Sequence, residues 1–169
     1  MLTGTRVSLQ QMLDCREHRQ QIQNTYISQF HATVISFCMN IPGDIKTTPA
    51  IRMLFAEGKE AILHRLDDLH SEILDQLEIH QVTGDEFILC VTEDATLIKK
   101  NMTDIEELHP LGRLFDIDVI NADGTKLART TFRSCMICQC PAHECARSRK
   151  HSIQELQDNI EFMLNRYFI

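Results

Sequence analysis

The feature that most constrains the fold of this 169-residue chain is the change in apolar spacing along it. Segments whose apolar residues recur every three or four positions predict helices, and short alternating or β-branched runs predict strands. The predicted order is helix, strand, helix, two strands, helix, two strands, helix. This order indicates a single α+β domain over residues 1–169, with helices and a mixed sheet in two layers.

Capping signals mark where the predicted helices begin. Residues 8–11 (SLQQ) and 152–155 (SIQE) are capping boxes, and Thr48 is a good N-cap before Pro49 at the first helical position. We expect helices over residues 8–25, 48–69 and 95–108, and a last helix from residue 152 onward.

The predicted strands cover residues 31–39, a hairpin around the turn at 83–85, and residues 114–120. Helical spacing could continue through Ile73 and Leu77, but the turn favours the hairpin. A second hairpin, through residues 121–124 (NADG), is expected to add a strand over residues 126–132. Residues 134–151, rich in Cys and Arg, are expected to be irregular.

Composition excludes several classes of protein. There is no run of 18 apolar residues and no signal-peptide core, so we expect a cytoplasmic protein with no membrane contact. The seven cysteines, an odd number, argue against a disulfide framework.

The charge of this chain is unevenly distributed. The net charge of −7 argues against nucleic-acid binding, yet residues 126–151 carry +5 and the remainder −12. Such a basic segment suits a small polyanionic ligand or an acidic partner. A solvated basic loop is an equally good interpretation of the charge alone.

Two aspartates alternate with apolar residues in the segment 113–119 (RLFDIDV), which overlaps the strand predicted over residues 114–120. Asp116 and Asp118 then share one face, about 7 Å apart, and can converge on one Mg²⁺ ion that also binds substrate phosphates. Arg113 beside them can pair with phosphate. A half-exposed structural strand would show the same alternation.

Four cysteines and a histidine follow this strand. Cys135 and Cys138 have the spacing of a zinc knuckle, and Cys145 and His151 could complete a structural zinc site. Cys140 and His143, in the same segment, are spare candidates. Reduced thiols that pack an irregular loop are the alternative interpretation.

These segments together resemble one enzyme family. Residues 109–119 (HPLGRLFDIDV) resemble the H-P-L-G-R-L-W-D-I-D-V signature of the citrate lyase holo-acyl-carrier-protein synthases, with Phe115 in place of the usual Trp. Residues 42–46 (PGDIK) are similar to that family's P-G-x-I-K. Arg133-x-Cys135-x2-Cys138, then residues 145–147 (CAR) and His151, look like its later motif, to which Cys140 is an addition. The motif core spans residues 109–151.

The resemblance implies a nucleotidyltransferase-like fold and a reaction. The family transfers phosphoribosyl-dephospho-coenzyme A from 2′-(5″-triphosphoribosyl)-3′-dephospho-coenzyme A to a serine of the apo acyl carrier subunit of citrate lyase, and diphosphate leaves. Magnesium is expected at Asp116 and Asp118.

The resemblance also implies roles for the basic side chains. Arg113 and Lys46 would contact phosphates, while Arg133, Arg147 and His151 would bind the triphosphate or dock the acidic carrier. The serine proton would pass to His109 or an aspartate, although His109 could equally cap the helix end.

Two other functions stay open at this point. One is a zinc-stiffened interaction module without enzymatic activity, in which the aspartates are merely exposed. The other is the same chemistry on another acyl carrier, such as that of malonate decarboxylase.

Overall fold

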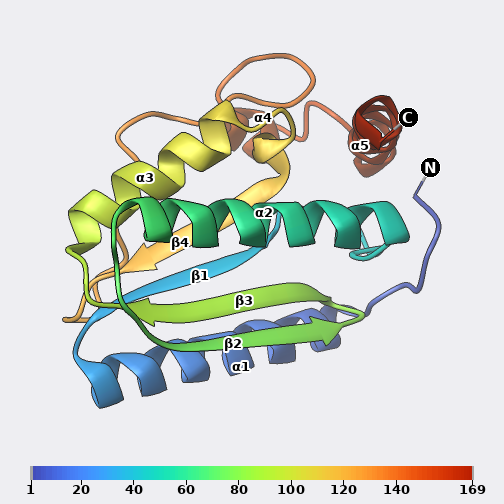
Figure 1. Ribbon diagram of the computed structural model, residues 1–169. Coiled ribbons are helices and arrows are strands. Elements are labelled where there is room, and N and C mark those ends of the chain that lie inside the picture. Colours follow the sequence, from blue (N-terminus) through green and yellow to red (C-terminus); the bar gives the residue numbers. More distant parts are fainter. Residues whose placement is uncertain (1, 169) are drawn as a thin grey trace.

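The computed structural model describes residues 2–168, which form a four-stranded sheet with helices on both faces (Figure 1). The strand order is β2-β3-β1-β4. The strands are β1 (Thr33–Met39), β2 (Ile73–Gln81), β3 (Gly84–Val91) and β4 (Phe115–Ile120). The helices are α1 (Leu9–Phe30), α2 (Pro49–Asp68), α3 (Ala95–Leu108), α4 (Ala142–Arg147) and α5 (Ile153–Phe168), with a short 3-10 helix η1 (Gly112–Leu114) before β4.

The topology consists of two split β-α-β units. β1-α2-β2 and β3-α3-β4 each leave one strand position between their two strands, and the other unit supplies the strand that fills it. This is the β-α-β-β-α-β arrangement of ferredoxin-like folds. The predicted single α+β domain is confirmed.

The sheet differs from the expectation in its pairing and its layers. All three neighbouring pairs among the described strands are antiparallel, where a mixed sheet was expected, because each helical crossover skips one position. Helices also cover two faces instead of one: α2 and α3 pack on one side and α1 on the other (Figure 1).

The helices begin at the capping signals. Ser8 and Ser152 form the predicted capping boxes, and Thr48 accepts a hydrogen bond from Ile51 N. Helix α1 runs five residues past its predicted end, to the left-handed C-cap His31 at φ 49°. Within residues 2–168, no helix combines the length and apolar character that spanning a bilayer requires.

The main core lies between the sheet and the α2/α3 layer. Phe37 of β1 stacks on Phe55 of α2 at 5.0 Å between ring centroids, and Phe115 of β4 meets Phe37 edge-on at 5.4 Å. Gly58 of α2 is buried against both of the rings that come from strands, Phe37 and Phe115. Its missing side chain lets α2 approach the sheet closely.

The two predicted hairpins had different outcomes. The hairpin β2-β3 is confirmed, pairing Gln81 with Gly84 at its turn. The predicted strand over 126–132 is wrong: only a single bridge, Ile120 to Lys126, continues the sheet. Beyond it the chain leaves β4 because Arg129 turns toward acidic residues of α3. The segment expected to be irregular contains the short helix α4.

Substituting Gly58 by alanine should destabilise the fold. A methyl group there would lie 2.5 Å from Phe37 Cζ and 3.1 Å from Phe115 Cε1. Overpacking outweighs the better helix propensity of alanine, so we expect a net loss of about 1–2 kcal/mol in the free energy of unfolding. Urea denaturation measures it.

The control is Glu60→Ala, an exposed position on the same helix, which should change stability by less than about 0.5 kcal/mol. A Gly58→Ala protein as stable as the parent would contradict the close packing described here.

Candidate functional site

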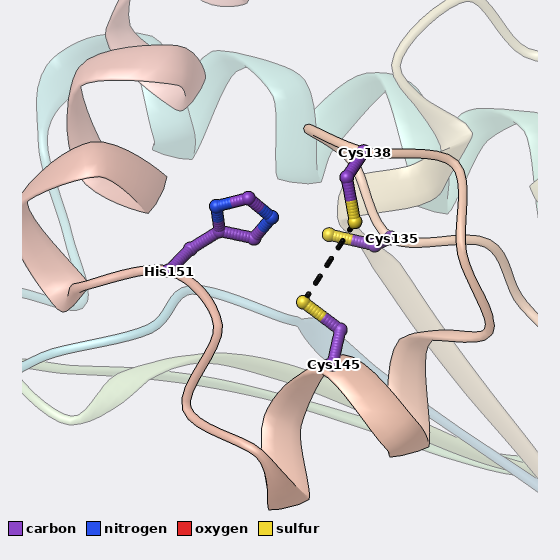
Figure 2. A group of neighbouring side chains, drawn as sticks. All are labelled: Cys135, Cys138, Cys145 and His151. Carbon is purple, nitrogen blue, oxygen red and sulfur yellow. Dashed lines mark hydrogen bonds between the residues drawn. The ribbon is translucent and has the colours of Figure 1, made fainter.

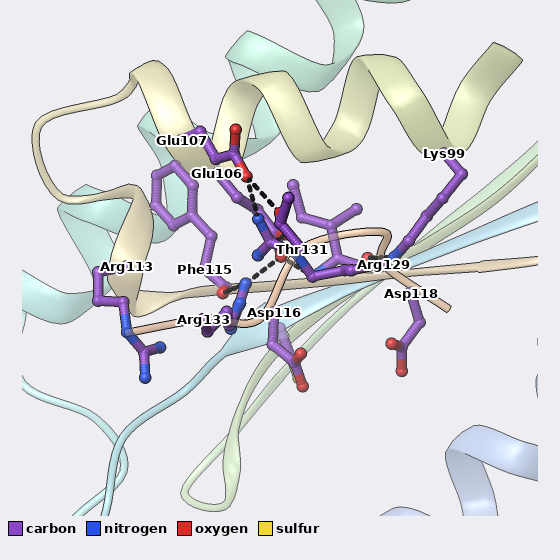
Figure 3. A network of polar contacts seen from close by, with 12 residues as sticks. Lys99, Glu106, Glu107, Arg113, Phe115, Asp116, Asp118, Arg129, Thr131 and Arg133 are labelled. Atoms are coloured by element: carbon purple, nitrogen blue, oxygen red, sulfur yellow. Dashed lines mark hydrogen bonds and ion pairs between the residues drawn. The ribbon is translucent and has the colours of Figure 1, made fainter. Parts of the chain in front are cut away.

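The two aspartates of β4 lie side by side on one face of the strand. Phe115, Ile117 and Val119 are buried in the α2/α3 core, and Asp116 and Asp118 are half-buried on the opposite face. Figure 3 shows both carboxylates pointing to the same side of the strand. The predicted alternation is thus present, and it directs both carboxylates toward the α1 side of the sheet.

A cavity of about 310 Å³ opens on this side of the sheet, between β4, the end of β1 and α1. Two neighbouring hollows, of about 230 and 270 Å³, also include Asp118 and Lys126 in their walls. We call the three together the acid-pair groove. Its main cavity also contains four cationic side chains: Arg16, Arg19, Lys46 and Lys126.

The cations of the groove differ in how they are held. Lys126 Nζ lies 2.5 Å from Asp118 Oδ2, and Lys46 Nζ donates to Ile41 O at 2.6 Å. Arg19 Nε donates to the buried carboxylate of Glu86 at 2.6 Å, so its charge is already matched. Burial lowers the pKa of Lys46. Lys46 and Lys126 are the two lysines that line the main cavity with the acid pair.

A half-buried thiol lines the main cavity of the groove. Cys38 Sγ, on β1, is 3.9 Å from Asp116 Oδ2, and burial raises the pKa of Cys38 to about 12. The thiol is neutral at physiological pH. It therefore adds no charge to the acid pair.

The edge of β4 is fixed by a buried carboxylate on α3. Glu106 Oε1 accepts a hydrogen bond from Ile117 N at 2.9 Å, and Glu106 Oε2 binds Arg129 Nη1 at 2.9 Å. Arg133 binds the same carboxylate and also donates to Phe115 O at 2.6 Å (Figure 3). Burial raises the pKa of Glu106, whereas Arg133, Ile117 N and Arg129 lower it.

The structure does not bring all predicted site residues together. Lys46 joins Asp116 and Asp118 in the groove, and Arg133 reaches one neighbouring hollow while bound to Glu106. Arg147 is exposed on α4 and lines none of the cavities that contain the acid pair.

His109 and Arg113 lie away from the acid pair. The His109 ring packs between Phe115 and Tyr167, at 4.8 and 5.7 Å, and its Nδ1 accepts from Leu111 N. It thus belongs to the core side of β4. Arg113 Nε donates to Ser134 O at 2.7 Å, and its side chain borders a different cavity, near the cysteines.

The predicted cysteine and histidine set does come together. The ligand atoms of Cys135, Cys138, Cys145 and His151 all lie within 4.8 Å of one another (Figure 2). The neighbouring His151 side chain lowers the pKa of Cys138 to about 6, whereas burial raises the pKa of Cys145 to about 12. The spare candidates Cys140 and His143 are not part of this group.

This group fits a tetrahedral metal ion. Zn–S bonds of about 2.3 Å place sulfur atoms about 3.8 Å apart, and Cys138 Sγ and Cys145 Sγ are 4.0 Å apart. His151 Nε2 is buried without a hydrogen-bond partner, and a metal ion would serve as its partner. Gln139 and Arg149 adopt left-handed backbone at φ 61° and 48°, which turns the chain back on either side of α4.

Comparison with known proteins identifies the family. The sequence model of the CitX family, described as apo-citrate lyase phosphoribosyl-dephospho-CoA transferase, matches residues 7–167. The chain belongs to this family. The resemblance inferred from residues 109–119 is therefore confirmed.

Three relatives illustrate how far the similarity extends. A probable apo-citrate lyase phosphoribosyl-dephospho-CoA transferase of Vibrio cholerae serotype O1 (strain M66-2) is 34% identical over 95% of this chain and 93% of its own length. The transferase of Escherichia coli O139:H28 is 31% identical over 94% and 89%. Protein CitXG of Haemophilus influenzae is 32% identical over 94% of this chain but only 35% of its own length, so this CitX-family chain matches one part of it.

Some residues of the groove in this CitX-family chain were not found from the sequence. Arg16 and Arg19 lie three positions apart, hence on one helix face, but α1 looked polar all round. Lys126 was counted only as part of the basic segment. Glu106 resembled any exposed helical acid, because nothing local signals that arginines more than 20 residues away will bury it.

The purified chain should contain one zinc ion, and its loss should depend on which cysteine is changed. Cys135→Ser removes a ligand, so we expect zinc content to fall well below one per chain and thermal stability to drop. Mass spectrometry of the metal and a melting curve measure both.

Cys140→Ser is the matched control, since it alters a cysteine of the same loop that lies outside the ligand group, and it should keep full zinc. Equal zinc in both variants, or none in the parent protein, would exclude this metal site.

Proposed function

We propose that this chain transfers phosphoribosyl-dephospho-CoA from 2′-(5″-triphosphoribosyl)-3′-dephospho-CoA to a serine of the apo acyl carrier subunit of citrate lyase, with release of diphosphate. Membership of the family supports the overall reaction. The observation that carries the site is the pair Asp116 and Asp118 in the main cavity of the groove, together with four cationic side chains. We also propose that the protein acts in the cytoplasm.

The groove has the electrostatic composition that a triphosphate requires. Lys46 and Lys126 are positioned to neutralise phosphate oxygens, and Arg16 adds a further charge from α1. Lys126 forms an ion pair with Asp118 and is largely exposed, so it can exchange this carboxylate for a phosphate with little strain.

The acid pair suits a hard divalent cation. Asp116 and Asp118 offer carboxylate oxygens on one face of a rigid strand, with the neutral thiol of Cys38 beneath them. They would hold magnesium, which would neutralise phosphate charge and orient the reacting oxygens. These residues therefore fit the ion that the family resemblance implies.

In the proposed reaction the serine oxygen of the carrier attacks the α-phosphorus. A new P–O bond joins the serine to the phosphoribosyl group, the bond from the α-phosphorus to the bridging oxygen breaks, and diphosphate leaves with that electron pair. The chain supplies no nucleophile, and its main contribution is positioning and charge stabilisation.

The geometry favours a carboxylate over His109 as acceptor of the serine proton. His109 is packed against Phe115 on the core side of β4, and burial lowers its pKa. Asp116 and Asp118 line the groove itself. Arg133 supports this site by holding β4 through Phe115 O, in addition to any contact with substrate.

The two alternative functions have less support. A non-enzymatic zinc module would give no reason for cations to surround the acid pair. A carrier from malonate decarboxylase would use the same groove, but the family and the named relatives refer to citrate lyase. The choice of carrier is therefore part of the test below.

The direct test is to incubate the protein with the triphosphoribosyl donor, magnesium and apo carrier. We expect the carrier to gain the mass of one phosphoribosyl-dephospho-CoA group in intact-protein mass spectrometry, and chelation of magnesium to prevent the gain. Carriers from citrate lyase and malonate decarboxylase are compared in parallel. No modification of either carrier, while a known transferase works in the same mixture, would exclude the proposed function.

Neutralising either groove aspartate should abolish transfer without unfolding the protein. Asp116→Asn and Asp118→Asn keep the side-chain shape but lose the charge that would bind metal, so we expect turnover to fall at least about a hundredfold. Initial rates with saturating donor measure this, and circular dichroism verifies the fold.

Asp123→Asn, on the exposed turn that follows β4, is the control and should retain the parental rate. Near-parental turnover in either groove variant would contradict the assignment of the acid pair.

A further inference from the structure

A second cavity, distinct from the acid-pair groove, lies where the cysteine loop meets the first turn of α5. Its volume is about 570 Å³, within the range of about 300–1,000 Å³ that is typical of small-molecule sites. Much of the wall is apolar, with Met136, Ile153 and Leu156 among its residues. Cys135, Cys145 and His151 of the metal group form another part of the wall, so a bound metal would fix its shape.

Two cations border this largely apolar space. Arg113 Nη1 is buried and has no hydrogen-bond partner, although Nε of the same guanidinium is satisfied by Ser134 O. Arg149 borders the cavity from a left-handed position at φ 48°. A buried donor without a partner is costly, and an anionic ligand would satisfy it.

The cavity adjoins the acid-pair groove. Asn40, the residue after β1, contributes to the walls of both, and the chain continues through Ile41 on the groove side and Pro42 on the cavity side. Asn40 N donates to Leu114 O at 2.7 Å, which anchors this partition to the residue just before β4. A ligand that crosses Asn40 would reach both spaces.

We propose that this cavity binds the adenosine diphosphate part of the dephospho-CoA donor, while the triphosphate occupies the acid-pair groove. This inference rests on the proposed function and names the subsite that recognises the donor. The adenine ring would pack on Met136 and Leu156, and Arg113 and Arg149 would pair with the 5′-diphosphate.

The connectivity of the donor matches the arrangement of the two spaces. Its triphosphate and its adenine are joined through two linked riboses, so the reacting phosphorus and the base are one short spacer apart. A pocket for the base directly beside the acid pair meets this requirement, and the rigid strand end at Asn40 separates the two. Binding energy from the unreactive adenosine would then hold the α-phosphorus in place.

The test places a negative charge at the mouth of the cavity. Ile153 is 58% exposed in the first turn of α5, where an acidic residue is favourable for the helix, so Ile153→Glu should fold normally. Leu97, 41% exposed in the first turn of α3 and outside this cavity, gives the matched control Leu97→Glu. Calorimetry on the zinc-loaded full chain measures the Kd of 3′-dephospho-CoA and, separately, of inorganic triphosphate.

We expect Ile153→Glu to raise the Kd of 3′-dephospho-CoA at least about tenfold, because the new carboxylate repels the diphosphate. The Kd of inorganic triphosphate should change less than about twofold, as should both values for Leu97→Glu. In the transfer assay kcat/KM for the donor should fall and the KM for the donor should rise, because the adenosine no longer helps to hold the α-phosphorus in place. Arg113→Gln should weaken 3′-dephospho-CoA binding in the same direction.

Several outcomes would overturn the proposal. They are an unchanged Kd of 3′-dephospho-CoA in Ile153→Glu, an equal weakening of both ligands, or no binding of 3′-dephospho-CoA to the parent protein. A parent protein that modifies the carrier but shows any of these results keeps the proposed function and loses the subsite. A parent protein that binds 3′-dephospho-CoA as predicted but modifies no carrier keeps the subsite and loses the function.

Discussion

One buried carboxylate, that of Glu106 on α3, holds three parts of this structure together. It accepts a hydrogen bond from Ile117 N, which fixes the outer strand β4. It also binds Arg129 and Arg133, which fix the chain beyond β4. Removing one partner of such a buried network typically costs about 3–5 kcal/mol, because charges are left without compensation. The acid pair on β4 and the start of the cysteine loop both depend on this interaction.

This network also separates the two roles of positive charge in the basic segment. Arg129 and Arg133 are mainly structural, since both are bound to Glu106, whereas Lys126 lies in the groove beside Asp118. Net charge along the sequence could not distinguish these roles. A segment with a charge of +5 therefore contributes less free positive charge to the groove than its composition suggests.

Much of the architecture could be predicted from local patterns. The capping boxes at Ser8 and Ser152 and the Thr48-Pro49 signal locate three helices, and the turn at Gly84 locates the β2-β3 hairpin. The strand expected over 126–132 failed for a tertiary reason: an ion pair with α3 outweighs continued pairing. Local patterns could not predict the antiparallel pairing of the described strands either, because it depends on which strand takes the position that each crossover leaves open.

For the candidate site, too, local patterns predicted some residues and missed those that depend on tertiary packing. Asp116 and Asp118 could be predicted because strand alternation fixes their common face, and the cysteine group because knuckle spacing reflects metal geometry. Arg16 could not, because only the packing of α1 against the sheet brings it to the groove. The location of the His109 ring could not be predicted, because its position in a motif does not indicate which side of β4 the ring will occupy.

The sheet order has a consequence for how this protein folds. The central strand β1 pairs with strands that are made much later: its Cys38 and Asp116 of β4 are 78 residues apart. Loop closure over such distances must precede the gain from pairing, which slows folding. During synthesis β1, which has five consecutive buried residues, is made before β3 and β4, the strands that pair with its two edges. The acid pair meets β1 only when β4 docks, so completion of the sheet and assembly of the groove are a single late event.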